Sequence, residues 1–264
     1  MNKTKLFLIL GSLATCLLAP INYAILPESL TERISNHLLS QALEPEEIRQ
    51  QAEAISVRVK TNNNTGSGVI IGKAGNTYTV MTNAHVIQQK VPNKIVTIDG
   101  EVHDAKIIHQ GNSLEGNDLG ILTFNSAKLY QVATLVANPN IEENLRVYSV
   151  GFPEEMKEFY VAKGLLKIQA PKPFIGGYRI GYDVDVKPGM SGGALLNNQG
   201  QLIGINGLLK APILNEAYTY VDGSKPFRQQ IENYRQLSFA IPIETLVEVA
   251  PNLALIPSRG DNPV

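Results

Sequence analysis

Cysteine is almost absent from this sequence. Its 264 residues include a single cysteine, Cys16, which lies in an apolar stretch near the N-terminus. The absence of thiols beyond that stretch excludes disulfides, thiol catalysis and cysteine–zinc sites there. A positive excess is also absent, because the formal net charge is −1. Binding to a phosphate backbone depends on such an excess, so we expect no nucleic-acid partner.

Charged residues make up only 18% of the chain and hydrophobic residues 44%. This is an ordinary globular balance and excludes wholesale disorder. The length suits one large β domain or two small ones that share an interface. No H-E-x-x-H motif is present, and His103 and His109 lack acidic residues at ligand spacing. We therefore expect neither a metal nor another cofactor.

Residues 1–24 have the pattern of a secretory signal peptide. Two lysines precede an apolar run over residues 6–20, and Ala24 offers a small residue at a possible cleavage site. The run is shorter than the ~20 residues of a spanning helix. We expect cleavage, a secreted or periplasmic location, and only transient membrane contact through the signal. An uncleaved anchor and a lipoprotein attached at Cys16 are the alternatives.

Residues 25–54 form a separate segment with apolar residues at helical spacing. Pro45, followed by two glutamates, suits the first turn of a helix. We expect two short helices here. The segment is either a structural arm packed on the core or a propeptide that is removed, and the sequence does not decide between them.

From residue 55 to residue 264 the hydrophobic pattern changes to the period of β-strands. Short runs with alternating or continuous apolar residues are bounded by glycine, asparagine or proline. This pattern predicts antiparallel β-barrels or a sandwich, closed by a C-terminal helix over residues 242–249. The expected strands cover residues 56–60, 68–71, 77–82, 95–98, 102–108, 119–124, 146–150, 160–168, 179–186, 193–196 and 201–206.

Ser191 lies in a glycine-rich segment that could hold a nucleophile on a tight turn, although such a segment is also typical of an ordinary β-turn. All four histidines precede Ser191, which excludes the α/β-hydrolase order, and no aspartate precedes Asp99, which excludes the subtilisin order with His85. The order that remains is His85, Asp118 and Ser191, as in the chymotrypsin-like double barrel.

Six segments of the chain resemble conserved blocks of trypsin-like serine proteases, and in particular of their bacterial HtrA-like branch. The resemblance covers residues 55 to about 250 and implies an all-β fold of two six-stranded antiparallel barrels. The catalytic blocks are residues 82–86, 117–121 and 189–195, and the framework blocks are residues 66–70, 202–206 and 238–242.

The resemblance also implies a role for each site residue. Ser191 would be the nucleophile, His85 the general base and acid, and Asp118 the group that orients the imidazole. The backbone N–H groups of Gly189 and Ser191 would form the oxyanion hole. The implied activity is that of an exported serine endopeptidase acting on peptides or proteins. The alternatives are a catalytically silent barrel that binds peptides or a partner, and an esterase with the same triad.

Three residues are candidates for substrate binding. Asp185 lies six residues before Ser191, where chymotrypsin-like enzymes often have the floor of the specificity pocket. A desolvated carboxylate there would favour cleavage after arginine or lysine. A structural ion pair or a solvated edge is the alternative, and HtrA-like pockets usually favour small aliphatic residues. Asn206 and Gly207, at the end of a framework block, are expected to contact substrate.

The sequence departs from the family pattern in three ways. Met190 stands where trypsin-type zymogens have an aspartate that binds the freed N-terminus, so the oxyanion loop must be ordered by other means. Residues 207–237 form a long insertion, either a gate or a peripheral addition, with a helix expected over residues 225–235. The chain ends at Val264, so we expect no PDZ domain, and the oligomeric state is not indicated.

Overall fold

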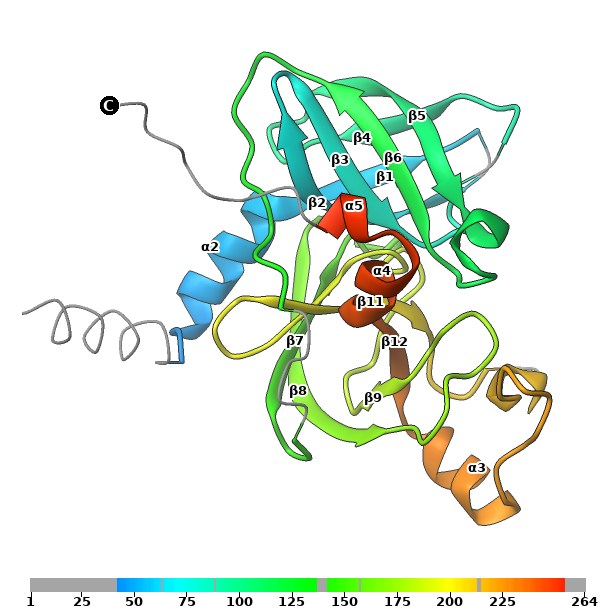
Figure 1. Cartoon of the computed structure of the whole chain (residues 1–264). Coiled ribbons are helices and arrows are strands. Elements are labelled where there is room, and N and C mark those ends of the chain that lie inside the picture. The colour runs from blue at the N-terminus through cyan, green and yellow to red at the C-terminus, as the bar shows by residue number, and fades with distance from the viewer. Residues whose placement is uncertain are drawn as a thin grey trace, which may run out of the picture. The chain divides into compact units, whose positions relative to one another are not determined.

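The computed structural model describes residues 42–254, apart from residues 63, 88, 137–141, 157 and 213–214. Within these residues the chain forms two closed antiparallel barrels of six strands each (Figure 1). The two-barrel, all-β prediction is therefore confirmed. The expected signal peptide and the first expected N-terminal helix lie outside the described residues.

The first barrel has the strand order β1-β2-β3-β6-β5-β4. Side chains alternate along each strand, so every second residue faces the barrel interior. Val57 and Val59 of β1 show this alternation, because both are fully buried while Lys60 is exposed. The strands are β1 (Ser56–Lys60), β2 (Thr65–Ala74), β3 (Thr77–Thr82), β4 (Asn93–Val96), β5 (Val102–Gln110) and β6 (Gly120–Asn125).

The second barrel has the strand order β10-β11-β12-β9-β8-β7. Its interior is filled by buried aliphatic and aromatic side chains, including Val147, Leu195 and Ile203. The strands are β7 (Arg146–Gly151), β8 (Tyr160–Gln169), β9 (Ile180–Tyr182), β10 (Ala194–Leu196), β11 (Leu202–Leu208) and β12 (Ser238–Pro242).

The helices are short and lie outside the barrels. The helix expected to start at Pro45 is present, and it buries Ile48, Ala52 and Ile55. None of the helices in the described ranges has the length and apolar character needed to span a membrane. They are α2 (Pro45–Ile55), α3 (Arg228–Tyr234), α4 (Ile243–Val249), α5 (Pro251–Ala254) and the 3-10 turns η1 (Gly111–Leu114) and η2 (Asn215–Tyr218).

Strand β9 differs from the sequence prediction, which extended it over residues 179–186. After Tyr182 the Asp183 N–H still donates to the Leu165 carbonyl at 3.1 Å, and side chains then supply hydrogen bonds to this segment. The Asp183 carboxylate accepts the N–H of Leu165 at 2.7 Å, and the Ser238 hydroxyl donates to the carbonyl of Val184 at 2.9 Å. The prediction was wrong for residues 183–186 because alternating hydrophobicity does not show whether a strand keeps its partner.

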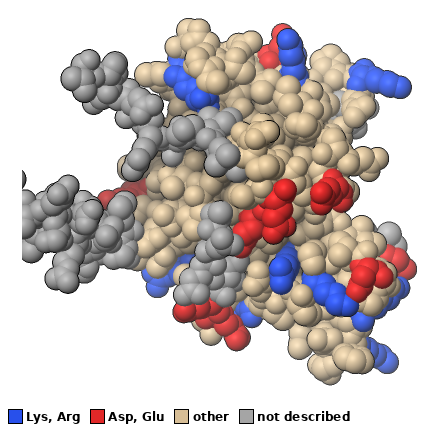
Figure 2. Space-filling model, in the orientation of Figure 1, with Lys and Arg blue, Asp and Glu red and all other residues tan. Residues whose placement is uncertain are grey.

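A hydrophobic cluster joins the two barrels. It combines Val69 and Ile71 of β2 with Tyr148 and Val150 of β7, and Leu246 of α4 packs into the same cluster. Because this contact continues the core, the facing edges of the barrels hold a fixed arrangement. On the face shown in Figure 2, uncharged residues cover most of the surface, and the basic side chains stand in small separate groups.

Candidate active site

His85 and Asp118 come from neighbouring strand ends of the first barrel. Strands β3 and β6 pair antiparallel, with Thr82 opposite Gly120, so the residues just after β3 and just before β6 meet at one end of the barrel. Nδ1 of His85 lies 2.6 Å from Oδ2 of Asp118, and the His85 backbone N–H donates to Oδ1 at 2.9 Å. These two contacts fix the imidazole against the carboxylate.

Ser191 lies on a turn of the second barrel that packs against the first. Its carbonyl accepts the N–H of Ser67 at 2.8 Å. Gly192, at φ +83°, faces the segment before His85: a Cβ at this glycine would lie 3.1 Å from the backbone nitrogen of Asn83. The structure thus brings Ser191 to the edge that carries His85. No hydrogen bond between the Ser191 hydroxyl and the His85 ring is present in the described part of the chain.

The turn before Ser191 presents two backbone donors. Within residues 42–254 as described, neither Gly189 N–H nor Ser191 N–H donates to a protein group. Gly189 has φ +91°, and a Cβ there would lie 2.5 Å from the carbonyl oxygen of Phe152. Only glycine can hold this backbone without strain, so the turn depends on it.

Ser67 of β2 holds this turn in place. Met190 cannot form the ion pair of trypsin-type enzymes, so another contact has to order the turn. Its buried hydroxyl donates to the Gly189 carbonyl at 2.7 Å and accepts the Phe152 N–H at 2.8 Å. A backbone bond from Glu154 to the Pro188 carbonyl, at 2.9 Å, supports the same turn. Sequence reasoning placed Ser67 in a framework block but did not find this role.

Tyr178 is a further site residue that sequence reasoning missed. Its hydroxyl makes a short hydrogen bond to Oδ2 of Asp118, the same oxygen that His85 contacts. Burial, and then the charge of Asp118, raises the pKa of Tyr178 well above its ordinary value. The hydroxyl therefore keeps its proton and acts as a donor. The sequence feature that could have indicated this role is the pair Gly176 and Gly177 directly before Tyr178, because glycines let another segment approach the backbone closely.

Asn206 is enclosed by hydrogen bonds. Its amide lies inside the second barrel, where Tyr182 donates to Oδ1 at 2.8 Å and Nδ2 donates to the Ala194 carbonyl at 2.9 Å. Its backbone N–H donates to the Gly193 carbonyl, and its carbonyl accepts the Gly192 N–H, each at 2.9 Å. The backbone of Asn206 thus holds the turn that follows Ser191, and its side chain bonds within the barrel. Its expected contact with substrate stays a prediction.

Asp185 and Gly207 have different surroundings. Asp185 is exposed, so it lacks the desolvation on which a preference for basic residues depends. Gly207 lies at an irregularity of the β11–β12 pairing, between Asn206 and Leu208, and faces the Tyr178 ring. It is half-buried beside the Asp118 contact.

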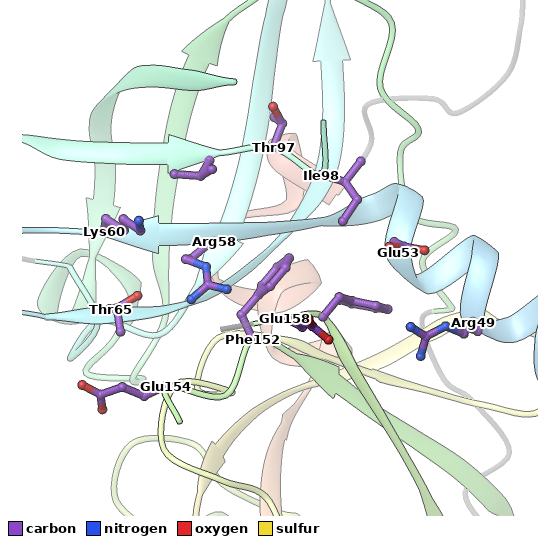
Figure 3. Close-up of a pocket in the computed structure, with 12 residues that line it drawn as sticks. Arg49, Glu53, Arg58, Lys60, Thr65, Thr97, Ile98, Phe152, Glu154 and Glu158 are labelled. Carbon is purple, nitrogen blue, oxygen red and sulfur yellow. The ribbon is translucent and has the colours of Figure 1, made fainter. Parts of the chain in front are cut away.

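A groove of about 790 Å³ lies between the first barrel, α2 and the segment after β7 (Figure 3). The Arg58 guanidinium lies 4.8 Å from the centre of the Phe152 ring, and burial lowers the pKa of Arg58. His85, Asp118 and Ser191 do not line this groove. It adjoins the active-site turn through Phe152 and Glu154, whose backbone N–H groups bond to Ser67 and to Pro188.

Two six-stranded barrels, with a histidine–aspartate pair on one and a glycine-flanked serine turn on the other, define the class of chymotrypsin-like double-barrel proteins. The family described as trypsin-like peptidase domain matches residues 66–205. This match covers more than half of the chain, and the chain belongs to that family.

Relatives with this domain are bacterial serine proteases. The chain is 32% identical over 209 residues to the periplasmic pH-dependent serine endoprotease DegQ of Escherichia coli, covering 74% of this chain and 43% of DegQ. It is 29% identical over 195 residues to the serine protease Do-like HtrA of Lactobacillus helveticus, covering 71% of this chain and 42% of that protein. The chain thus spans less than half of each relative.

The fold also matches a solved structure. The crystal structure of the serine endoprotease from Yersinia pestis superimposes with a TM-score of 0.60 at 22% sequence identity. The match covers 81% of this chain and 68% of that chain. At this identity the likeness supports the double-barrel fold alone.

Proposed function

We propose that this protein is a serine endopeptidase that cleaves peptide bonds with Ser191, His85 and Asp118. The observation that carries the proposal is the His85–Asp118 pair, which two hydrogen bonds hold at 2.6 and 2.9 Å. It stands beside a serine turn whose Gly189 and Ser191 N–H groups have no protein acceptor among the described residues. A binding module has no physical need for this combination.

The mechanism follows from these groups. The Ser191 hydroxyl attacks the carbonyl carbon of the scissile peptide bond, and Nε2 of His85 takes the proton of the hydroxyl. Asp118 accepts the Nδ1–H hydrogen bond, which fixes the tautomer and stabilises the imidazolium. The oxyanion binds to the N–H groups of Gly189 and Ser191. His85 then protonates the leaving amine, and water hydrolyses the acyl-enzyme.

The apo geometry requires one adjustment before reaction. The Ser191 hydroxyl must turn toward Nε2 of His85, because no hydrogen bond joins the two side chains in the described structure. Catalytic hydrogen bonds commonly tighten only when substrate binds. The half-exposed ring of His85, with 48% of its side-chain surface accessible, leaves room for a substrate to complete this contact.

Substrates and location follow from the relatives and from the N-terminal sequence. Relatives named as proteases support a peptide or protein substrate, and DegQ is named as periplasmic. Together with the signal-like pattern of residues 1–24, this supports export to the periplasm or beyond. The intact mass of protein recovered from the periplasm tests this: cleavage after Ala24 supports it, and a full-length cytoplasmic product contradicts it.

The decisive test of the enzymatic proposal is active-site labelling with a fluorophosphonate, read by intact mass. We expect one adduct on the wild type and none on Ser191→Ala. Ser126→Ala, which removes a serine hydroxyl that accepts a backbone N–H at the end of β6 opposite to Asp118, is the matched control and should keep the adduct. An unlabelled wild type that still binds peptides would favour the catalytically silent barrel instead. Turnover of short acyl esters without cleavage of peptides would indicate the esterase.

A further inference from the structure

We propose that Tyr178 is a positioning residue for Asp118, and that the insertion over residues 207–237 holds Tyr178 in place. The two residues come from different barrels. Asp118 precedes β6 of the first barrel, and Tyr178 precedes β9 of the second. This inference rests on the proposed function, since it assigns a role around the carboxylate of that triad.

Two contacts connect Asp118 to the segment that ends at Tyr178. The Tyr178 hydroxyl donates to Oδ2, and the Asp118 backbone N–H donates to the carbonyl of Gly176 at 2.8 Å. The first barrel supplies the other two contacts of the carboxylate, from the ring and the backbone of His85. The carboxylate is thus held from both barrels, and it cannot rotate without breaking a contact.

The Tyr178 ring occupies a narrow slot between glycines. A Cβ at Gly207 would lie 2.6 Å from Cε1 of the ring, and a Cβ at Gly176 would lie 3.1 Å from Cε2. Gly176 and Gly177 have φ values of +87° and +88°, which few other residues adopt. The ring is 7% exposed. This packing directs the hydroxyl to Asp118 and explains why glycine stands at positions 176 and 207.

The insertion covers the base of this segment. The Ile175 N–H donates to the Thr219 carbonyl at 2.8 Å, and the Val221 N–H donates to the Pro173 carbonyl at 3.0 Å. Figure 1 shows the insertion, with α3, beside β9 and β12 of the second barrel. Because backbone bonds attach it directly before Gly176, the insertion is a support of the active site rather than a peripheral addition.

An aromatic cluster fastens the insertion. Phe174 stacks on Tyr220 with ring centres 5.1 Å apart and an interplanar angle of 11°. All rings of the cluster are buried, so the insertion contributes core-like packing instead of a flexible cover. The other rings that pack edge-on against Phe174 are Tyr218, Tyr234 and Phe239.

The Tyr178 hydrogen bond also has an electrostatic effect. His85 and Tyr178 are the titratable groups that contact the Asp118 carboxylate in the described structure. A donor on Oδ2 shares the negative charge of the carboxylate, which then stabilises the His85 imidazolium less. Loss of this donor with Asp118 still in place would therefore raise the pKa of His85. Loosening of Asp118 alone would remove its interaction with the imidazolium and lower that pKa.

The opposite signs give the test. The full-length protein and its Tyr178→Phe variant are titrated by NMR on the His85 imidazole, and fluorophosphonate labelling rates are measured in parallel. We expect the pKa of His85 to fall in Tyr178→Phe, because the carboxylate that is no longer held moves away from the imidazolium. We expect the labelling rate at about pH 7 to fall about tenfold. Tyr78→Phe removes another buried, hydrogen-bonded hydroxyl, and this control should leave both quantities unchanged.

A second variant protects the test against misfolding. Gly207→Ala keeps the hydroxyl but places a methyl group against the Tyr178 ring, and the same downward shift of the His85 pKa is expected. An unchanged or raised pKa in the folded variants would overturn the positioning role of Tyr178. Because the titration needs no turnover, an unlabelled wild type would reject the endopeptidase proposal while the NMR result still decides the role of Tyr178.

Discussion

Replacement of Ser67 by alanine tests how the active-site turn is ordered. The Ser67 hydroxyl connects β2 of the first barrel to the Gly189 carbonyl, at 2.7 Å, and to the Phe152 N–H, at 2.8 Å. Ser67 is fully buried, so no water replaces the hydroxyl once it is removed. Ser67→Ala then takes the partner from one partly buried acceptor, the Gly189 carbonyl, and from one buried donor, the Phe152 N–H.

The magnitude follows from these two groups. A buried polar group that loses its partner costs about 1–3 kcal/mol, so we expect Ser67→Ala to lower the free energy of unfolding by about 2–4 kcal/mol. The effect on acylation should be larger than this loss suggests. Release of the Gly189 carbonyl leaves the preceding Pro188–Gly189 peptide, which carries the Gly189 N–H, supported by the Glu154 bond. We expect this peptide to turn, and loss of one oxyanion donor slows the reaction about 100- to 1,000-fold.

The assay compares Ser67→Ala with Ser56→Ala. Ser56 is also buried, and its hydroxyl donates to the Ala52 carbonyl at 2.7 Å where α2 joins β1. Ser56→Ala should lose about 1 kcal/mol in urea unfolding and keep the wild-type rate of fluorophosphonate labelling. If Ser67→Ala loses stability but is labelled within about twofold of the wild-type rate, the turn is ordered by other contacts and the reasoning is refuted.

Three further predictions follow from single residues. Gly189→Ala should lose both stability and labelling, whereas Gly75→Ala, also at positive φ but in open space, should keep labelling; equal rates in the two variants would contradict the steric argument. Burial raises the pKa of Glu244 in the folded state, so the free energy of unfolding falls as the pH rises beyond the ordinary pKa of glutamate. Glu244→Gln should therefore raise the Tm at about pH 7 but not at about pH 4. A lower Tm at about pH 7 would contradict this. Because its carboxylate is exposed, Asp185→Ala should leave the cleavage pattern of a peptide library unchanged, and loss of cleavage after arginine or lysine would show that Asp185 reaches the substrate.

Much of the fold could be predicted from the sequence because a strand with one buried face has apolar residues at every second position. Alternation in residues 56–60 and 77–82 reflects which side chains face the barrel interior, and β1 and β3 have these bounds. The helix start at Pro45 was likewise predicted from the residues of one turn. Strand β9 was overextended, since its end depends on hydrogen bonds to Leu165 and Ser238 in other strands.

The His85–Asp118 pair could be predicted from the sequence for a related reason. Each residue lies at the end of a recognisable strand, and chain order left one arrangement of histidine, aspartate and serine. Residue type at a strand end does not show what surrounds a side chain, however. Asp185 and Asn206 were both candidates for substrate binding, and the structure exposes the first and encloses the second in hydrogen bonds.

The alternation of apolar residues along the chain specifies the strands of two barrels, and the chain order of histidine, aspartate and serine specifies the residues of a serine-protease site. How that site is held depends on contacts between the barrels. The Ser67–Gly189 bond joins residues 122 apart in sequence, and the Tyr178–Asp118 bond joins residues 60 apart. Both bonds cross from one barrel to the other. The alternation of apolar residues shows which side chains of one strand face the core. The two contacts between the barrels form only when the barrels pack together, so no pattern within one strand indicates them.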